Sequence, residues 1–198
     1  MLSVMLRRLG LVEWESSQEQ GAKTAAAMIL LSVLGAGLTG LLAQICLPLP
    51  GTPIPLTGQV LAVLLCGAVL GSGYGALSQV IYVLLGVAGI PWFSGGRGGF
   101  GVLLGSTGGY LVGFVVAALY LGTVSEAKTD AKTIIGEIRR MLIAVGIIWF
   151  FGLVNRIVIS QITLVEALKQ GVVPFLASDI LMAVMAAFFT SAVLPKKS

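Results

Sequence analysis

Two charged residues lie inside long apolar stretches of this sequence. Asp179 follows the apolar segment Val172–Ala177, and Arg156 lies within the largely apolar segment Ile138–Thr163. An ionisable side chain at such a place costs a few kcal/mol in a membrane unless a partner or a ligand satisfies it. Because a carboxylate accepts N–H groups and a guanidinium binds carboxylates, both residues are candidates for binding a small polar molecule.

A third charge stands in a glycine-rich run. Arg97 is the only charged residue between Pro91 and Tyr110, and Trp92 and Phe93 lie close to it in the chain. Glycines let the backbone come close to a ligand, and a guanidinium offers a planar fork to one carboxylate while aromatic rings cover an apolar body. We therefore expect Arg97, Trp92 and Phe93 to contact a ligand. The alternative is a flexible loop whose arginine meets lipid headgroups.

The segment Leu47–Leu56 is apolar and contains four prolines. An apolar loop exposed to water is unfavourable, but the same loop is useful as a lid that folds over the mouth of a helical bundle or over a ligand. We expect this segment to act as such a lid.

The composition places these residues in a membrane. Of the 198 residues, 57% are hydrophobic and only 10% are charged, whereas a soluble domain carries about 25% charged residues. With no histidine and only Cys46 and Cys66, the usual zinc and haem sites and a Ser-His-Asp triad are excluded. We expect an integral membrane protein with no catalytic residues, no metal site, no cofactor and no nucleic-acid partner.

The apolar stretches predict an all-α fold with six transmembrane helices in one domain, residues 23–198. The two short helices in the middle meet at the turn Gly71–Gly73, and one of them is a candidate re-entrant segment. Residues 1–22 form a polar segment before the first span, either an interfacial helix or a disordered tail. The expected spans are Ala25–Leu47, Leu56–Leu70, Tyr74–Ile90, Thr107–Gly122, Ile138–Thr163 and Val173–Leu194.

The basic residues set the orientation. With six spans and a cytoplasmic N-terminus, nine Lys and Arg residues fall on the cytoplasmic side, and only Arg97 and Lys169 fall in external loops. This distribution follows the positive-inside rule and predicts that both termini are cytoplasmic. We therefore expect a multi-pass protein of the cell membrane, in contact with the lipid bilayer.

This topology places Arg156 and Asp179 at similar depths. Each lies about six residues from the external end of its span, which is roughly 9 Å along a helix. We expect Arg156 either to pair with Asp179 or to bind a carboxylate of the ligand. The alternative is that Arg156 faces lipid and extends to the interface.

Small residues recur on the first span. Ser32, Ala36 and Gly40 stand at a spacing of four residues, which lets another helix approach closely. This stripe predicts either internal packing or a docking face for a partner subunit.

Four segments together resemble one known family. They are Ala43–Pro50, Ile54–Leu65, Gly95–Gly99 and Gly105–Phe114. Their order and spacing are similar to those of the BioY family, the biotin-specific S components of energy-coupling-factor (ECF) transporters, and the resemblance covers about Ala25–Leu194. It implies an S-component fold of six helices, a biotin pocket closed by external loops, and docking of the first helix on a transmembrane coupling subunit driven by two ATPase subunits.

The chain departs from the family pattern at two positions. Ser106 stands where the family usually has proline before Thr-Gly-Gly-Tyr, and Met182 stands where the sixth helix usually has lysine after Gly-Asp-x-x. Asp179 matches the family's aspartate, but a ligand role of the lysine does not carry over. We expect Arg156 to supply the missing cation.

Biotin fits the residues available. Its carboxylate suits an arginine, its ring and chain suit Trp92 and Phe93, and its ureido N–H groups suit Asp179. Further polar candidates, each with core packing as the alternative, are Gln59, Gln79, Tyr82 and Tyr110. The function predicted is binding of biotin outside and its delivery across the membrane, by a protein that is not an enzyme. The alternatives are an S component for another small carboxylated vitamin and a structural membrane protein.

Overall fold

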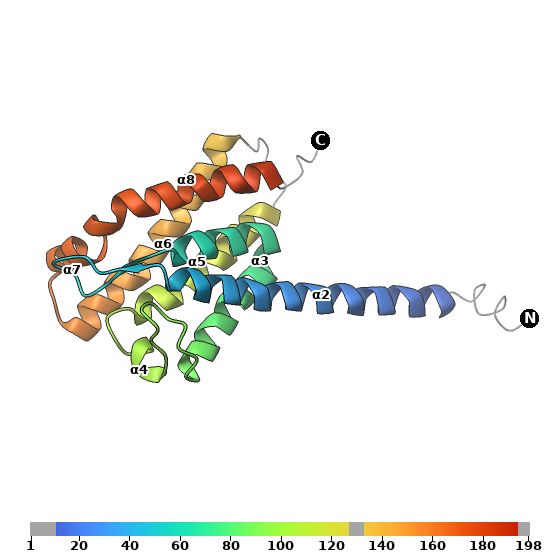
Figure 1. Cartoon of the computed structure of the whole chain (residues 1–198). Helices are drawn as coiled ribbons and strands as arrows, with labels where there is room; N and C mark the ends of the chain where they lie inside the picture. The colour runs from blue at the N-terminus through green and yellow to red at the C-terminus, as the bar shows by residue number, and fades with distance from the viewer. Residues whose placement is uncertain (1–10, 127–132, 194–198) are drawn as a thin grey trace, which may run out of the picture.

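The computed structural model describes residues 11–126 and 133–193, and the fold in this part of the chain is all-α (Figure 1). The helices are α2 (Leu11–Ala43), α3 (Gln59–Val87), α4 (Phe100–Leu103), α5 (Gly108–Glu126), α6 (Ile134–Ser160), α7 (Leu164–Gly171) and α8 (Leu176–Val193), with a 3-10 turn η1 (Val173–Phe175) before α8. An antiparallel pair of two-residue strands, β1 (Cys46–Leu47) and β2 (Leu56–Thr57), closes the base of the proline-rich loop. Five segments in the described residues are long and apolar enough to span a membrane.

Helix α3 holds two of the expected spans. Gly71 interrupts it with φ 83° and ψ 178°, a conformation that residues with a side chain avoid. Next to the turn the two arms are in contact, because a Cβ at Gly75 would stand 2.8 Å from the Cα of Gly67. In Figure 1 the arms diverge from this turn as teal and green ribbons. The turn predicted at residues 71–73 is therefore present.

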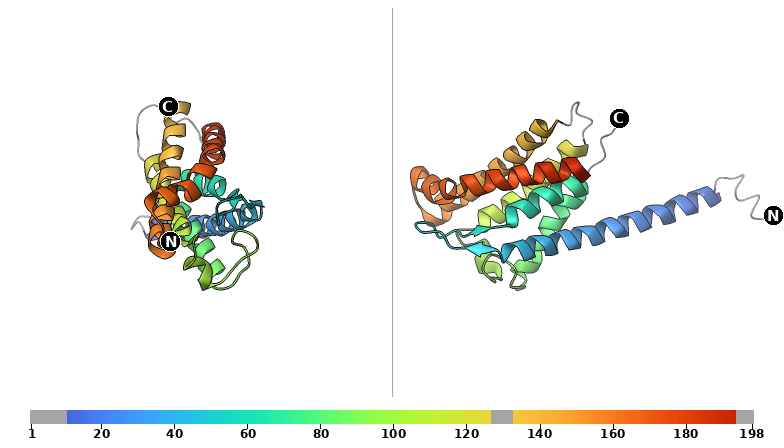
Figure 2. Two further views of the ribbon diagram at one scale, coloured as in Figure 1. Left: turned by 90° about the vertical axis from the view of Figure 1, so that its left-hand side faces the viewer. Right: turned by 45° about the horizontal axis from the view of Figure 1, so that its top comes forward.

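Helix α2 lies at the edge of the bundle and is 33 residues long. Residues 11–22 are its first turns and continue into the span without a break, whereas residues 1–10 of the predicted N-terminal segment lie outside the described residues. Figure 2 shows this N-terminal part of α2 extending beyond the other helices.

The small-residue stripe of α2 packs inside the protein. Ser32 and Ala36 have no exposed surface, and the Ser32 hydroxyl donates to the carbonyl oxygen of Tyr74 at 3.0 Å. The buried Gly40 lies against Trp92, whose ring would be 2.9 Å from a Cβ at that position. The assignment of Ser32, Ala36 and Gly40 as a docking face is therefore wrong for this structure, and the internal packing that the sequence left open is observed.

The connection before α8 is more structured than the sequence predicted. Thr163 caps α7 by a capping box with Glu166, which satisfies the first backbone N–H groups of the helix. The chain then turns through η1, so that α8 begins at Leu176 rather than at Val173. Figure 1 shows α7 and the proline-rich loop at the end of the bundle opposite to the start of α2 and the end of α8.

Candidate ligand-binding site

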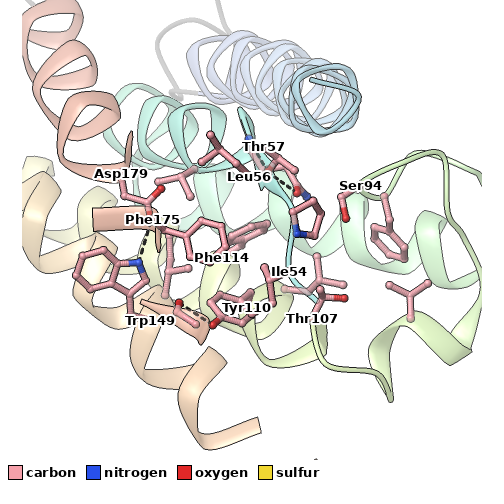
Figure 3. Close-up of a pocket in the computed structure, with 18 residues that line it drawn as sticks. Ile54, Leu56, Thr57, Ser94, Thr107, Tyr110, Phe114, Trp149, Phe175 and Asp179 are labelled. Atoms are coloured by element: carbon pink, nitrogen blue, oxygen red, sulfur yellow. Dashed lines mark hydrogen bonds between the residues drawn. The ribbon is translucent and has the colours of Figure 1, made fainter. Parts of the chain in front are cut away.

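A cavity opens inside the bundle at the end that carries α7 and the proline-rich loop. Its volume is about 60 Å³, which is below the roughly 300–1,000 Å³ of typical small-molecule sites, so side chains in the wall must move to admit a ligand. Its walls come from the proline-rich loop, the glycine-rich loop, α3, α5, α6, α7, η1 and α8. Figure 3 labels ten of the lining residues: Ile54, Leu56, Thr57, Ser94, Thr107, Tyr110, Phe114, Trp149, Phe175 and Asp179.

Asp179 lies in the wall formed by α8 and is 5% exposed. Its Oδ2 accepts a hydrogen bond of 2.8 Å from the indole Nε1–H of Trp149 on α6 (Figure 3). Its Oδ1 has no hydrogen bond to the described part of the chain. The carboxylate is thus held by one donor and has an oxygen left for a donor in the cavity.

Tyr110 forms the wall between α5 and α6. Its ring packs on Gly152, where a Cβ would stand only 2.3 Å from the ring carbons. Its hydroxyl donates to the carbonyl oxygen of Gly171 at the end of α7, at 2.9 Å. Close helix packing at a glycine therefore places this phenol in the cavity wall.

Gln59 begins α3 and lines the cavity, with Tyr82 behind it. The Gln59 amide donates to the Tyr82 hydroxyl at 2.7 Å and accepts from the Thr57 hydroxyl at 2.8 Å. Tyr82 is fully buried, and Trp92 packs on its ring and donates from its indole nitrogen to the Tyr82 carbonyl oxygen. Tyr82 and Trp92 do not line the cavity. Tyr82 therefore positions the Gln59 amide from behind the cavity wall, and Trp92 holds Tyr82 in place.

Phe93 lines the cavity and is 1% exposed. Its ring packs on Gly86 of α3, where a Cβ would stand 2.2 Å from the ring. Gln79, in contrast, lies away from the cavity, because its amide bonds to the hydroxyls of Thr39 and Ser78 between α2 and α3. For Gln79 the core-packing alternative holds.

Arg97 lies outside the cavity and is exposed. Its Nε donates to the Ser94 carbonyl oxygen at 3.0 Å, and its Nη2 donates to the Ser94 hydroxyl at 2.9 Å. It lines a second, outer cavity between the two loops, and Ile54, Pro55 and Ser94 line both cavities. Arg97 therefore stands on the outer side of the residues that separate the site from the solvent.

Arg156 is only 2% exposed, so the alternative in which it faces lipid and extends to the interface is wrong. It also makes no ion pair with Asp179, because its Nη2 donates to the side-chain oxygen of Gln170 and Asp179 accepts from Trp149. Arg156 and Asp179 do not pair because their side chains lie at different depths in the bundle. Trp149 and Arg156 are seven residues apart on α6, about 10 Å along the axis, and α8 starts late enough to place Asp179 level with Trp149.

No group of three or more His, Cys, Asp or Glu residues that could hold a metal ion occurs in residues 11–126 and 133–193.

The sequence profile of the BioY family matches residues 16–197, which is most of the chain. This chain belongs to the BioY family. It is 44% identical over 138 residues to the probable biotin transporter BioY of Methanothermobacter thermautotrophicus, a match that covers 66% of this chain and 88% of that protein. It is 38% identical to the biotin transporter BioY of Thermotoga maritima, over 70% of this chain and 80% of that protein.

A solved structure shares the fold. The S-component for biotin from an ECF-type ABC transporter matches 89% of this chain and 95% of its own chain, with a TM-score of 0.80 and 22% sequence identity. Together with the apolar helices, the relatives named as transporters identify this BioY-family chain as a multi-pass membrane protein.

Sequence reasoning missed several residues of the site in this BioY-family chain. Trp149 is the most important, since its N–H is the protein donor that holds Asp179. An indole N–H in an apolar span needs an acceptor, and this requirement was the available signal. The other lining residues that were not singled out include Thr57, Ser94, Thr107, Phe114 and Phe175.

Proposed function

We propose that this BioY-family chain is the substrate-binding S component of an ECF-type transporter and that its ligand is biotin. The observation that carries the proposal is the cavity in which Asp179, held by Trp149, presents a carboxylate oxygen among aromatic rings. The names of its relatives and the fold shared with a solved biotin S-component support the same conclusion.

The cavity suits the ureido head and the sulfur-containing ring of biotin. Asp179 accepts a ureido N–H at Oδ1, and the rings of Phe114, Trp149 and Phe175 cover the apolar faces of the bicycle. Gln59 and Thr57 offer further polar atoms to the ureido group or to the chain. Hydrogen bonds to a charged carboxylate in a site shielded from water fix both the position and the orientation of the ligand.

The two loops control access to the cavity. The proline-rich loop contributes Ile54 to the wall and is attached to α7 by a bond of 2.6 Å from the Thr52 hydroxyl to the Gln170 carbonyl oxygen. On the other side, the glycine-rich loop contributes Phe93 and Ser94, and Arg97 stands outside them. Biotin enters from outside when these loops separate.

The proposed topology has six crossings, because the two arms of α3 each cross the bundle, and both termini are cytoplasmic. In support of this topology, the start of α2 and the end of α8 lie at one end of the bundle, and the exposed Arg139 lies near the start of α6. The exposed Lys169 lies on α7 at the opposite end. This distribution of basic residues follows the positive-inside rule.

The protein is proposed to act as a transporter subunit in the cell membrane, with no catalytic residue of its own. Its partners are a transmembrane coupling subunit and two ATPase subunits, which provide the energy of transport. Because the stripe at Ser32, Ala36 and Gly40 is buried, the coupling subunit must contact another face.

Equilibrium binding of labelled biotin to the purified full-length protein tests the proposal. We expect saturable binding at one site, displaced by unlabelled biotin and not by an excess of pantothenate or nicotinate, which are other vitamins with a carboxylate. Displacement by one of those acids would identify the ligand as another carboxylated vitamin. The absence of saturable binding to any of the three would overturn the transport function.

A further inference from the structure

Arg156 is a buried cation that the proposed head-group contacts do not use. It is the largest fully buried side chain among the described residues. Its Nη2 donates to Gln170, while its Nε and Nη1 have no hydrogen-bond partner within the described chain. A buried guanidinium with unsatisfied donors is costly, so a site of this kind favours a negatively charged acceptor.

Only a thin wall separates this cation from the ligand cavity. Gly171 lines the cavity, and a Cβ built at Gly171 would stand 3.3 Å from the Cδ of Arg156 and 2.5 Å from the Tyr110 hydroxyl. The wall therefore consists of backbone at Gly171 and the phenol of Tyr110, which are joined by one hydrogen bond. Since a phenol can rotate once that bond is broken, a ligand group at this end of the cavity can reach the guanidinium.

The spacing along α6 matches a ligand with two polar ends. Trp149 and Arg156 lie on one face of the helix, about 10 Å apart, and Gly152 with the Tyr110 ring lies between them. Trp149 marks the end of the cavity at which Asp179 accepts N–H donors. A bicyclic head bound there directs an extended five-carbon acid chain along α6 toward Arg156.

We propose that Arg156 binds the carboxylate of the ligand, and that the Tyr110 hydroxyl leaves Gly171 to admit it. This inference rests on the proposed function, since it names the residue that neutralises the acid end of biotin. Arg97 is the weaker candidate for this role in the loaded site, because it lies outside the cavity and Ser94 occupies its Nε and Nη2.

The competing role for Arg156 is that of a structural clamp. Its bond to the side chain of Gln170 supports α7, and the Gln170 backbone in turn holds Thr52 of the proline-rich loop. A clamp would affect every ligand of the cavity equally, whereas a carboxylate-binding residue discriminates an acid from a neutral analogue. This difference separates the two roles.

The experiment measures the dissociation constants of biotin and of biotinamide, in which a neutral amide replaces the acid, for the purified full-length protein. We expect the wild type to bind biotin at least tenfold more tightly than biotinamide. In Arg156→Gln we expect this preference to disappear, because biotin binding weakens at least tenfold while biotinamide binding stays within threefold. Arg97→Gln is the matched control and should keep the preference.

Three results would overturn the inference: equal binding of the two ligands by the wild type, equal weakening of both in Arg156→Gln, or loss of the acid preference in Arg97→Gln instead. Should Arg156→Gln not fold, Arg156→Lys takes its place, since it keeps the charge and must keep the preference. Loss of the preference in Arg156→Lys, with biotinamide binding intact, would also overturn the inference. A wild type that binds neither ligand would instead contradict the proposed function.

Discussion

At the scale of single residues, the site depends on a buried carboxylate that the protein satisfies in part. Trp149 donates to one oxygen of Asp179, and the other oxygen is left for a donor in the cavity. Burying a carboxylate costs free energy that only charge-assisted hydrogen bonds offset. The arrangement therefore favours a ligand that brings N–H groups and penalises one that cannot donate.

Asp179→Asn is expected to weaken biotin binding at least tenfold while the protein keeps its thermal stability in detergent. The amide lacks the charge that strengthens the bonds to the ligand N–H groups, and a loss of about 1.5–3 kcal/mol is typical of hydrogen bonds to charged groups. Isothermal titration calorimetry with biotin measures the effect. Trp149→Phe, which keeps a ring but loses the N–H, should weaken binding less. Binding by Asp179→Asn within threefold of the wild type would show that Asp179 has a structural role only.

At the scale of elements, the turn inside α3 decides how the two arms place the site. It brings Gln59 at the start of the first arm into hydrogen-bond contact with Tyr82 near the end of the second. The turn is tightly packed, because a Cβ at Gly122 of α5 would stand 2.1 Å from the backbone nitrogen of Ser72. The fold at this point therefore requires both a left-handed backbone at Gly71 and the absence of a side chain at Gly122.

Gly71→Ala is expected to destabilise the protein by about 1–3 kcal/mol, because alanine is strained at a positive φ of this kind. Gly73→Ala is the matched control in the same turn, since no atom lies within 4 Å of a Cβ there and no positive φ is required. Thermal unfolding in detergent compares the two variants. Equal unfolding temperatures would mean that the turn does not depend on glycine at residue 71.

At the scale of the whole molecule, α2 is a peripheral helix whose inner face is fixed by small residues. Ala36 is fully buried against the bundle, whereas Gly37 has nothing within 4 Å of a Cβ and lies on the outer face. Large apolar side chains such as Leu34 and Leu41 are exposed on that outer face. In a membrane this surface faces lipid or another transmembrane helix.

Ala36→Trp is expected to abolish biotin binding and to lower the unfolding temperature, because an indole does not fit a fully buried position between α2 and α3. Gly37→Trp, one residue away on the outer face, should bind biotin as the wild type does. Binding assays on both purified variants provide the comparison. Normal binding by Ala36→Trp would show that α2 packs differently from this structure.

Local sequence patterns determined the membrane class, the all-helical fold and the turn at residues 71–73, because span length, hydropathy and glycine content act within one element. The same patterns singled out Asp179, Phe93, Gln59 and Tyr110, which all line the cavity. The resemblance to the BioY family, carried by motifs in the loops and helix starts, also came from the sequence alone.

Only the tertiary structure decided which faces of the helices look inward. Gln59 and Gln79 are both buried glutamines of α3, yet one lines the cavity and the other bonds to α2. In a membrane, lipid and protein interior are equally apolar, so hydrophobic periodicity does not mark the inner face of a helix. How the connecting segment folds sets the depth of a side chain on one helix relative to the next helix. For this reason the hydrogen-bond partner of Asp179 is Trp149 and not Arg156.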